Sequence, residues 1–557
     1  MTDSDRDDLS DDQSDNQAQV DRRQFLAVTT GIAALTAGCS SIASQGTPVA
    51  GRTPTGPVPT APFDSIRDWV AALDAHGLLL RFPEIDQDKY EATGIVFRST
   101  DLYGQYGAPG FLFEKVKMGG KWYDGPVLAN MQGHWNTDSI AFGLKPEPRE
   151  HYKNYQAVKD LMAEILKANG GKYPEIPPVE VAREDAPCKE ITLEGDDIDL
   201  TKFAFMQTNP YDDGRYVNTA SVFTSDPDMG NNYGTYRCAL RGPRYLALNP
   251  EPNQTGYKML MNAKERGEAT LPIALVLGQD PMVWMISGTR VAPRFGPKPV
   301  DELAVAGGFR GKAVDVVRCD TNDMLVPAHC EMVIEGEVPL DDASMRPEGP
   351  FGEMFGYLGP RKETNFIINV TRVTHRKDPW LMNAFTGMQR GMVTAPMDAL
   401  YENFLKKRIP NLVAYQTPQY CMGVIFMSID KQEPGEGLKS GLAIAKSNPI
   451  AKVIIVVDDD INILDPLEML FAVGSRWQPY PASEILENAF GLMTDPSQVE
   501  YQKTSKIVID ATKQIPGEGG QEVFPETNRA LLEKGAPDIW TIVDSKFGEK
   551  IKGWKEV

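Results

Sequence analysis

The sequence contains few of the residues from which zinc fingers, disulfide scaffolds and multi-histidine metal centres are built. Its 557 residues include six cysteines and five histidines, and no Cys-X-X-Cys pair occurs. This spacing excludes zinc fingers and a disulfide framework, and a site with several histidine ligands is not expected. Positive charge is also scarce, because 57 Lys and Arg face 77 Asp and Glu, for a net charge of −20. Non-specific nucleic-acid binding is therefore not expected.

The composition is otherwise that of a soluble globular protein, with 41% hydrophobic and 24% charged residues. The length allows roughly two to four domains. Part of the negative charge belongs to the start of the chain, because residues 1–21 hold eight Asp and one Arg. We find no internal repeat. The composition therefore predicts a globular protein with an acidic, polar leader.

The first 62 residues predict an export signal followed by a tether. Residues 21–26, Asp-Arg-Arg-Gln-Phe-Leu, resemble a twin-arginine signal, and the apolar stretch at 27–38 is too short for a membrane span. Residues 35–39 resemble a lipoprotein cleavage box ending at Cys39, and residues 40–62 are rich in Ser, Thr, Gly and Pro. We expect passage through the twin-arginine export machinery to a periplasmic or extracytoplasmic location, with a lipid anchor at Cys39. The alternative is a chance Arg-Arg pair before a weak helix.

The next segment has the pattern of a mixed α/β domain. Apolar residues recur at helical spacing over residues 66–73, with Asp64 or Ser65 as the N-cap and Gly77 past the end. A second helix is predicted over residues 155–168, and strand-like runs lie between the two. This pattern predicts an α/β domain.

From about residue 190 the pattern changes to short β-rich runs separated by Gly and Pro, which indicates a barrel or a sandwich. These runs are residues 221–224, 271–278, 282–287 and 366–373. The last part alternates again, because the apolar run at 452–457 is typical of a strand buried on both faces. Asp465 and Pro466 then predict the start of a helix.

We therefore expect a multi-domain α/β protein. The expected segments are a leader and signal at 1–39, a linker at 40–62, an N-terminal α/β domain at 63–185, a β-rich central domain at 186–375, and a C-terminal α/β domain at 376–557.

Two short motifs contain candidate chemistry. In residues 348–353, Glu-Gly-Pro-Phe-Gly-Glu, two carboxylates flank a segment that cannot be a regular helix. Two acids in one pocket separate each other's pKa values, so that one stays protonated near neutral pH. Residues 232–237, Asn-Tyr-Gly-Thr-Tyr-Arg, supply an amide and a guanidinium that suits a carboxylate. Taken singly, these motifs could be a solvated loop and a plain β-hairpin.

Other polar motifs occur nearby. Glu302 lies in Asp-Glu-Leu at 301–303, ahead of Gly-Gly-Phe-Arg-Gly at 307–311. His329 and Glu331 could suggest a metal site. Because apolar residues alternate with these polar ones, we expect instead that His329 is a hydrogen-bonded histidine within a strand.

In this order and spacing, the motifs resemble the UbiD family of reversible decarboxylases. Segments outside the two main motifs add to the resemblance, since three match the family's N-terminal domain and three its branch acting on aromatic acids. They are residues 66–69, 111–114 and 126–130, and residues 456–460, 510–512 and 516–518. The resemblance implies a central split β-barrel of the flavin-reductase-like kind that carries the cofactor, and a C-terminal domain for the substrate pocket and oligomerisation.

The resemblance also implies a cofactor and its ligands. The family binds prenylated FMN, with a divalent Mn²⁺ or Mg²⁺ ion at the phosphate and a monovalent cation such as K⁺ nearby. The positions here that match cofactor contacts are Asn232, Gly234, Thr235, Tyr236, Arg237, Asn253, Ser287, Gly288, Thr289, Arg290 and Glu302. Asn232 and Glu302 match two metal ligands. Where the family has a histidine as third ligand, this sequence offers Asn253, with Glu251 or water as alternatives.

The family's catalytic network of two glutamates and one arginine falls on Glu348, Arg237 and Glu353. The resemblance implies that Arg237 orients the substrate carboxylate, that Glu353 donates the proton that replaces CO₂, and that Glu348 holds Arg237. The implied partners are a small aromatic or α,β-unsaturated carboxylic acid, a prenyl-flavin synthase that supplies the cofactor, and further copies of the chain in a homodimer or higher homo-oligomer.

Two other functions stay open at this point. An exported split-barrel oxidoreductase using ordinary FMN would fit the β-rich middle and the signal, but it leaves the Glu–Arg–Glu set unexplained. A non-catalytic flavin-binding or assembly protein would fit the missing histidine. The spectrum of the bound flavin separates these alternatives.

Overall fold

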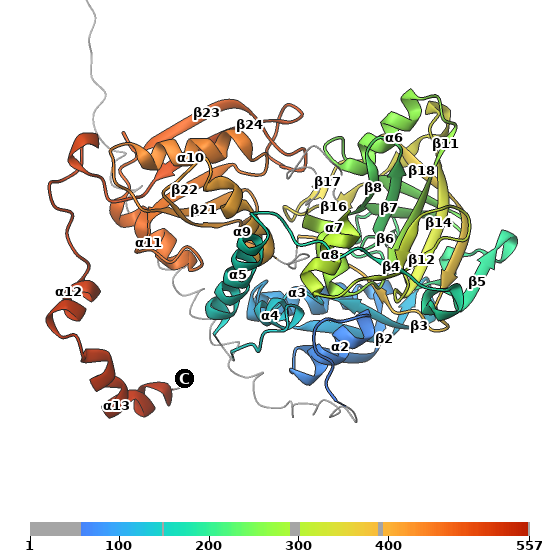
Figure 1. The fold of residues 1–557 in the computed structure, drawn as a ribbon, viewed down its shortest axis with the longest axis horizontal. Helices are drawn as coiled ribbons and strands as arrows, with labels where there is room; N and C mark the ends of the chain where they lie inside the picture. The colour runs from blue at the N-terminus through green and yellow to red at the C-terminus, as the bar shows by residue number, and fades with distance from the viewer. Residues whose placement is uncertain (1–56, 148–149, 290–300, 388–393, 555–557) are drawn as a thin grey trace, which may run out of the picture. The chain divides into compact units, whose positions relative to one another are not determined.

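The structure is a computed structural model that describes residues 57–147, 150–289, 301–387 and 394–554 (Figure 1). The predicted export signal, Cys39, most of the linker and Arg290 lie outside the described residues. The pattern of contacts between residues divides the chain into a compact unit at 54–524 and a second unit that contains residues 525–554. Among the described helices, none has the length and apolar character needed to cross a membrane.

The N-terminal segment builds a small mixed sheet with helices, as the sequence predicts. Its elements are α2 (Ile66–Ala75), β1 (Leu79–Asp86), α3 (Glu91–Tyr103), β2 (Gly110–Met118), β3 (Lys121–Ala129), α4 (Trp135–Ala141) and α5 (His151–Ala168). The strand order is β1-β2-β3-β19, where β19 (Leu381–Met382) comes from far along the chain. Ser65 caps α2 by accepting a hydrogen bond from the Asp68 N–H. The other predicted cap, Asp64, instead pairs with Lys312.

The central segment forms a ten-stranded sheet that curves into a half-barrel (Figure 1). The main path of the sheet is β6-β9-β10-β18-β14-β11-β7-β8, and β5 and β15 pair with β18. The strands are β5 (Ile191–Glu194), β6 (Tyr216–Val217), β7 (Ser221–Asp226), β8 (Gly230–Thr235), β9 (Arg237–Gly242), β10 (Tyr245–Asn249), β11 (Thr270–Leu277), β14 (Met332–Pro339), β15 (Arg346–Glu348) and β18 (Lys362–His375).

Helices and two small sheets complete the central segment. They are α6 (Thr255–Glu265), α7 (Pro281–Thr289), α8 (Glu302–Arg310), the sheet of β4 (Val179–Glu180), β12 (Asp315–Arg318) and β13 (Leu325–Pro327), and the pair β16 (Phe351–Gly352) and β17 (Leu358–Gly359).

Two predictions for this segment are wrong. The apolar run at 282–287 is not a strand but part of α7, because Asp280 accepts hydrogen bonds from the N–H groups of Met282 and Val283 and so starts a helix. His329 lies in the turn between β13 and β14 rather than in a strand. Its Nε2 is 3.1 Å from Asp315 Oδ2, so the histidine is hydrogen-bonded, as expected.

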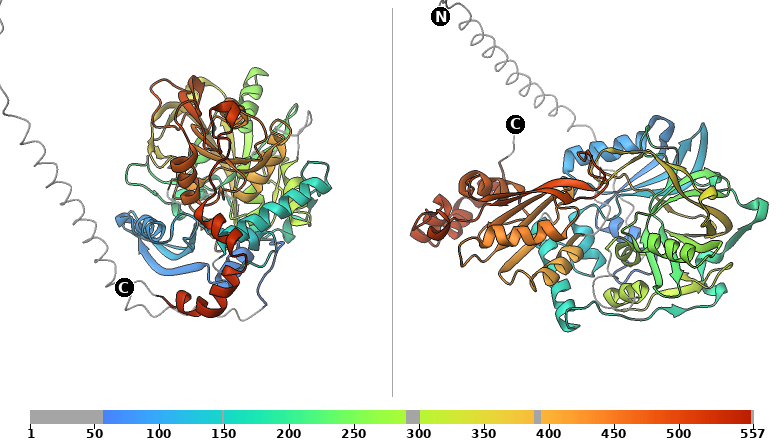
Figure 2. Two further views of the ribbon diagram at one scale, coloured as in Figure 1. Left: turned by 90° about the vertical axis from the view of Figure 1, so that its left-hand side faces the viewer. Right: turned by 90° about the horizontal axis from the view of Figure 1, so that it is seen from above.

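One hydrophobic core joins the N-terminal elements to the central sheet, which lie side by side in Figure 1 and Figure 2. Phe111 and Phe113 of β2 belong to the same buried cluster as Val222 of β7 and Leu275 of β11. The inward faces of the two sheets therefore bury each other, which fixes the central strands that carry the candidate site.

The C-terminal segment is an α/β unit with helices on both faces of a five-stranded sheet (Figure 1). The order is β20-β21-β22-β24-β23, for α9 (Thr394–Leu405), β20 (Leu412–Gln416), β21 (Val424–Ile429), α10 (Glu436–Ser447), β22 (Val453–Asp458), α11 (Pro466–Arg476), β23 (Ser483–Phe490) and β24 (Lys503–Asp510). Alternate residues of β22 pack in two separate cores, one with α10 and one with α11. The prediction of a strand buried on both faces is confirmed, and Asp465 caps α11.

The second unit contains α12 (Asn528–Gly535) and α13 (Ile539–Lys552). Large apolar side chains on these helices are exposed within the described chain, among them Trp540 and Phe547.

Candidate active site

Arg237 and two glutamates meet at the wall of a cavity in the central segment. Arg237 donates from Nε and Nη2 to the two carboxylate oxygens of Glu348, each at 2.9 Å. Its third interacting nitrogen, Nη1, donates to Glu353 Oε1. Glu348 is fully buried, and the Arg237 guanidinium also lies 4.9 Å from the centroid of the Phe351 ring. The two motifs that the sequence analysis singled out are therefore in direct contact.

Strand pairing explains how residues 111 positions apart come together. Arg237 begins β9, which pairs with β10, and β10 pairs in turn with β18. Glu348 ends β15, which pairs with β18 opposite Lys362. Arg237 and Glu348 are thus placed by four strands of one sheet, and the geometry depends on backbone pairing rather than on flexible loops.

The turn that follows Glu348 brings the second acid back to Arg237. Gly349 has a φ of +86°, which favours glycine, and Phe351 and Gly352 then form β16 against β17. The Gly352 N–H donates to Asp212 Oδ1 at 2.8 Å, which ties the turn to the loop before β6. Glu353 is fixed in turn by a hydrogen bond from its N–H to the Tyr357 carbonyl at 2.8 Å.

Burial is the largest single influence on the pKa values of Glu353 and Arg237. It raises the pKa of Glu353; the charge of Arg237 opposes this rise, and the negative charges of Glu251 and Glu348 add to it. Burial lowers the pKa of Arg237, but its hydrogen bonds and ion pairs with Glu348 and Glu353 raise that pKa by more. Arg237 therefore stays cationic, while Glu353 holds its proton to a higher pH than an ordinary glutamate.

Tyr216 also belongs to the site and is not among the residues that the sequence predicts. Its hydroxyl donates to Glu348 Oε1 at 3.0 Å, and burial followed by the charge of Glu348 raises the tyrosine pKa. Glu348 thus accepts two hydrogen bonds from Arg237 and one from Tyr216. No local pattern around Tyr216 marks it, because its role depends on strand β6 lying beside β9.

The cavity beside Arg237 has a volume of about 230 Å³. It is called the larger cavity below, because a second, smaller cavity contains other predicted site residues. Its walls combine the catalytic candidates with amide, hydroxyl and apolar side chains from both the central and the C-terminal segments. The lining residues are Asn218, Thr235, Tyr236, Arg237, Asn249, Glu251, Asn253, Gln254, Phe351, Glu353, Met354, Thr386, Phe490, Gly491, Leu492, Met493, Thr494 and Gln502. A cation, acids and apolar walls together suit a planar ligand that carries polar groups.

Several residues predicted to contact a cofactor lie near this cavity. Thr235, at the end of β8, has its Oγ1 2.7 Å from Ser287 Oγ. The Tyr236 hydroxyl accepts a hydrogen bond from the Gly256 N–H at 3.1 Å. Ser287, Gly288 and Thr289 form the end of helix α7.

A side chain at position 234 would require the Tyr236 ring to shift. A Cβ atom there would lie 2.8 Å from the Tyr236 hydroxyl oxygen.

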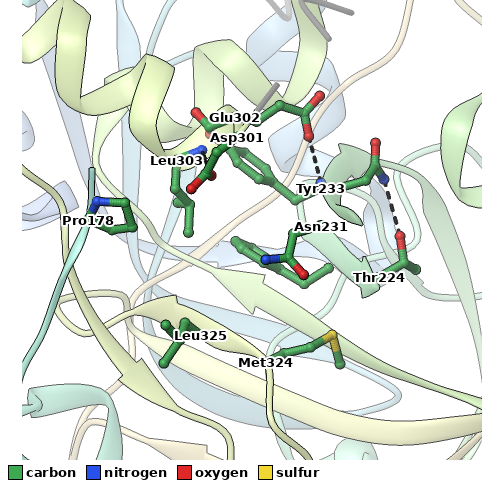
Figure 3. Close-up of a pocket in the computed structure, with 11 residues that line it drawn as sticks. Pro178, Thr224, Asn231, Tyr233, Asp301, Glu302, Leu303, Met324 and Leu325 are labelled. Carbon is green, nitrogen blue, oxygen red and sulfur yellow. Dashed lines mark hydrogen bonds between the residues drawn. The ribbon is translucent and has the colours of Figure 1, made fainter. Parts of the chain in front are cut away.

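A smaller cavity of about 60 Å³ is lined by two of the three predicted metal ligands, Asn232 and Glu302. Figure 3 shows the Glu302 carboxylate turned toward the backbone of Tyr233, whose N–H donates to Glu302 Oε2 at 2.8 Å. Asn232 donates through Nδ2 to Thr224 Oγ1 at 3.2 Å. Asn232 and Thr235 lie three positions apart on β8, so one strand contributes to both cavities.

Glu302 is a buried acid without a counter-ion in the part of the chain that the structure describes. Burial raises its pKa to about 8, the Tyr233 N–H lowers it, and Asp301 raises it further. A buried carboxylate of this kind is stabilised by a bound cation, and carboxylate and amide oxygens suit Mn²⁺ or Mg²⁺. Glu302 and Asn232 therefore fit a divalent ion.

The third predicted metal ligand, Asn253, is not among the residues that line the smaller cavity. Asn253 lines the larger cavity, and the two cavities share no lining residue. Within the described ranges, no group of three or more His, Cys, Asp or Glu side chains could hold a metal ion. The assignment of Asn232, Asn253 and Glu302 to one ion therefore stays a prediction.

Comparison with known proteins identifies the family. Residues 179–389 match the model of the 3-octaprenyl-4-hydroxybenzoate carboxy-lyase Rift-related domain. Residues 391–511 match the model of the C-terminal domain of the same carboxy-lyase. The chain belongs to the UbiD family. An uncharacterized protein of Aeropyrum pernix is 30% identical over 367 residues, which cover 64% of this chain and 72% of that protein.

Solved UbiD-class structures share the fold. The enzyme HmfF from Pelotomaculum thermopropionicum, solved in complex with FMN, is 27% identical with a TM-score of 0.68, over 84% of this chain and 98% of that one. Vanillic acid decarboxylase from Sedimentibacter hydroxybenzoicus, in its closed form, is 25% identical with a TM-score of 0.71, over 86% and 99% of the two chains. Membership of a carboxy-lyase family favours a lyase over the oxidoreductase alternative.

Proposed function

We propose that this UbiD-family chain catalyses the reversible, non-oxidative decarboxylation of an aromatic or α,β-unsaturated carboxylic acid with prenylated FMN. The observation that carries the proposal is the contact of Arg237 with Glu348 and Glu353 at the wall of the larger cavity. Two related structures support the cofactor, since HmfF was solved with FMN and an evolved dimeric form of it with prFMN.

Arg237 is suited to bind the substrate carboxylate. A guanidinium has five N–H donors, and Glu348 and Glu353 accept from three nitrogens. The donors that remain can orient a carboxylate. Because Glu348 is buried and holds Arg237 through two hydrogen bonds, the guanidinium is kept in place before substrate enters.

Glu353 is suited to supply the proton. When bound, the prenylated flavin supplies an electron sink for the carbanion that loss of CO₂ would leave. The raised pKa of Glu353 keeps more of its carboxyl protonated near neutral pH than an ordinary glutamate would be. Its contact with Arg237 supports a position for this acid beside the departing CO₂.

Several finer features belong to the same proposal. Asn232 and Glu302 would hold the divalent Mn²⁺ or Mg²⁺ ion, with K⁺ nearby, and the curved central sheet would be a split β-barrel of the flavin-reductase-like kind. The proposal also includes domain boundaries at 185 and 375, assembly into a homo-oligomer, and a prenyl-flavin synthase as cofactor supplier. Resemblance to the family supports these features.

We also propose export through the twin-arginine machinery, with cleavage before Cys39 and a lipid anchor there. Support comes from the Arg22–Arg23 pair and the residues that follow it. Mass spectrometry of the protein from fractionated cells tests this proposal. A cytoplasmic chain that still begins at Met1 would contradict it.

The test of activity is co-expression with a prenyl-flavin synthase, followed by mass and absorption spectra of the flavin that co-purifies. Aromatic and cinnamic-type acids are then screened anaerobically for CO₂ release. Prenylated flavin and turnover of at least one acid are expected. Unmodified FMN that is reduced by a nicotinamide donor, with no CO₂ release, would instead support the oxidoreductase.

A further inference from the structure

A further cavity, of about 270 Å³, is lined by residues of α9, β20 and α10 in the C-terminal segment. It is called the C-terminal cavity below, and it shares no lining residue with the two cavities at the candidate active site. Leu405, Tyr415 and Ile444 in its lining are buried, whereas Arg408 and Ser447 are exposed. The cavity therefore reaches from solvent into the core of the segment, and a small molecule can enter it.

The C-terminal cavity shares one feature with the active site, an arginine that lies against an aromatic ring. The Arg408 guanidinium is 5.1 Å from the centroid of the Phe404 ring, a distance close to the 4.9 Å between Arg237 and its ring. Arg237 is engaged by two glutamates, whereas Arg408 forms no ion pair or side-chain hydrogen bond with any residue in the described ranges. The N–H donors of Arg408 are therefore available to an anionic group, which a guanidinium can bind through two parallel hydrogen bonds.

A buried hydroxyl in the lining is a second donor. Tyr415 Oη accepts hydrogen bonds from Asn448 Nδ2 at 3.0 Å and from Thr417 Oγ1 at 3.3 Å. Neither bond uses the tyrosine proton, and no residue in the described part of the chain accepts it. Burial raises the pKa of Tyr415, so the hydroxyl keeps this proton. An acceptor on a ligand would complete the hydrogen bonding of Tyr415.

The charge of the lining favours an anion. Arg408 is the one charged residue among the eight described residues that line the C-terminal cavity. It follows Lys406 and Lys407, so three cations stand together in a chain whose net charge is −20. The acidic surface elsewhere repels a small anion, whereas this cluster of cations attracts it.

We propose that the C-terminal cavity is a second binding site, for a small aromatic carboxylate. The carboxylate binds Arg408, and the ring packs against the aromatic and aliphatic side chains of the lining. Tyr401 and Tyr415, whose ring centroids are 5.8 Å apart, favour an aromatic ring over an aliphatic one of similar size. The site is separate from the active site and does not depend on the proposed activity.

A hydrogen bond connects the C-terminal cavity to the wall of the active site. Pro449, which follows the lining residue Asn448, accepts at its carbonyl from the Leu492 N–H at 3.1 Å, and Leu492 lines the larger cavity. Lys506 holds the same turn, because its Nζ donates to the carbonyls of Asn448 at 2.8 Å and Ala445 at 2.9 Å. A ligand that contacts Asn448 is therefore expected to affect turnover at the active site as well.

Titration calorimetry of the flavoprotein with benzoate tests the binding site. The wild type should bind one benzoate per chain at the C-terminal cavity, with a Kd of about 1 mM or tighter. Arg408→Gln should weaken this binding about 10- to 100-fold, the range for a hydrogen bond to a charged group. Tyr415→Phe, which removes the buried donor, should weaken it about 2- to 10-fold.

Matched controls separate recognition from a general effect of charge. Lys407→Gln removes the same charge from an exposed residue outside the cavity lining, and it should change Kd by less than about 3-fold. Benzamide, which has no charge, should bind at least about 10-fold more weakly than benzoate. Cyclohexanecarboxylate, which lacks the aromatic ring, should bind about 2- to 10-fold more weakly.

Three results would overturn the assignment. They are benzoate binding that is the same in wild type and Arg408→Gln, an equal loss in Lys407→Gln, and benzamide that binds as tightly as benzoate. If benzoate does not bind and Arg408→Gln instead changes the assembly state in light scattering, the cavity is a contact between copies of the chain, and the proposal is wrong.

Turnover separates this site from the proposed activity. Added benzoate should change the kcat of the best acid in the wild type, whereas in Arg408→Gln it should change only the apparent KM, by competition at Arg237. If benzoate changes only the apparent KM in both proteins, the expected effect on the active site is refuted. If no acid releases CO₂ but benzoate binding depends on Arg408, the proposed function fails and the second site stands.

Discussion

Replacing Glu348 by Gln should cost both stability and activity, because Glu348 is the buried support of Arg237. The wild-type carboxylate accepts two hydrogen bonds of 2.9 Å from Arg237 and one of 3.0 Å from Tyr216. The glutamine side chain keeps one oxygen that can accept, but its NH₂ group then faces a donor of Arg237 or Tyr216, and the negative charge is lost. Breaking a buried ion pair from one side costs about 3–5 kcal/mol, and we expect a loss of unfolding free energy in this range.

Activity should fall further than stability alone explains. With one acceptor and the negative charge lost at position 348, the guanidinium of Arg237 loses its fixed position, and a misplaced group of this kind costs on the order of 100-fold in rate. Denaturant unfolding and kcat/KM on the best acid measure the two effects. Tyr216→Phe is the matched control, since it removes one neutral donor and should cost about 1 kcal/mol. If Glu348→Gln unfolds like Tyr216→Phe and keeps kcat/KM within about 3-fold of wild type, the supporting role is refuted.

The other predictions concern the proton donor and the metal. Glu353→Gln should retain the flavin spectrum and lose at least about 100-fold in kcat; an equally active variant would refute the proton-donor role. The raised pKa of Glu353 predicts that activity falls as pH rises through a value above 4.5, the ordinary pKa of a glutamate. The reason is that Glu353 then loses the proton that it donates. A pH profile of kcat/KM checks this, and an alkaline limb that persists in a residually active Glu353→Gln would assign it to another group. Glu302→Gln should weaken Mn²⁺ binding in titration calorimetry by at least about 100-fold, because loss of a residue that only supports a metal ligand already costs about 10- to 100-fold. Asp301→Asn, which alters the neighbouring acid, should change it less.

Local patterns in the sequence determined much of the secondary structure. The spacing of apolar residues and the capping residues placed α2 and α11, and the apolar run at 452–457 placed β22. These signals are local, because a cap or a periodic face depends on residues within one or two turns. The motifs at 232–237 and 348–353 were also visible as candidates for chemistry, and their order along the chain identified the family.

The sequence could not decide elements whose signal is ambiguous. A short apolar run such as 282–287 suits a buried strand and a buried helix equally. In the structure Asp280 caps a helix there, and burial on nearly all sides removes the amphipathic pattern that marks a surface helix. The apolar neighbours of His329 predict a strand, yet β13 ends at Pro327, and Ala328 and His329 form a turn.

Only the tertiary structure decided which side chains share the site. Arg237 reaches Glu348 because β9, β10, β18 and β15 pair in succession, and no periodicity in a single sequence encodes that register. The same applies to Tyr216, which the pairing of β6 with β9 brings to Glu348. Residue types and caps are local properties that the sequence shows directly. The hydrogen bonds of a buried side chain such as Glu348 depend on distant strands, and they become visible only when those strands are packed together.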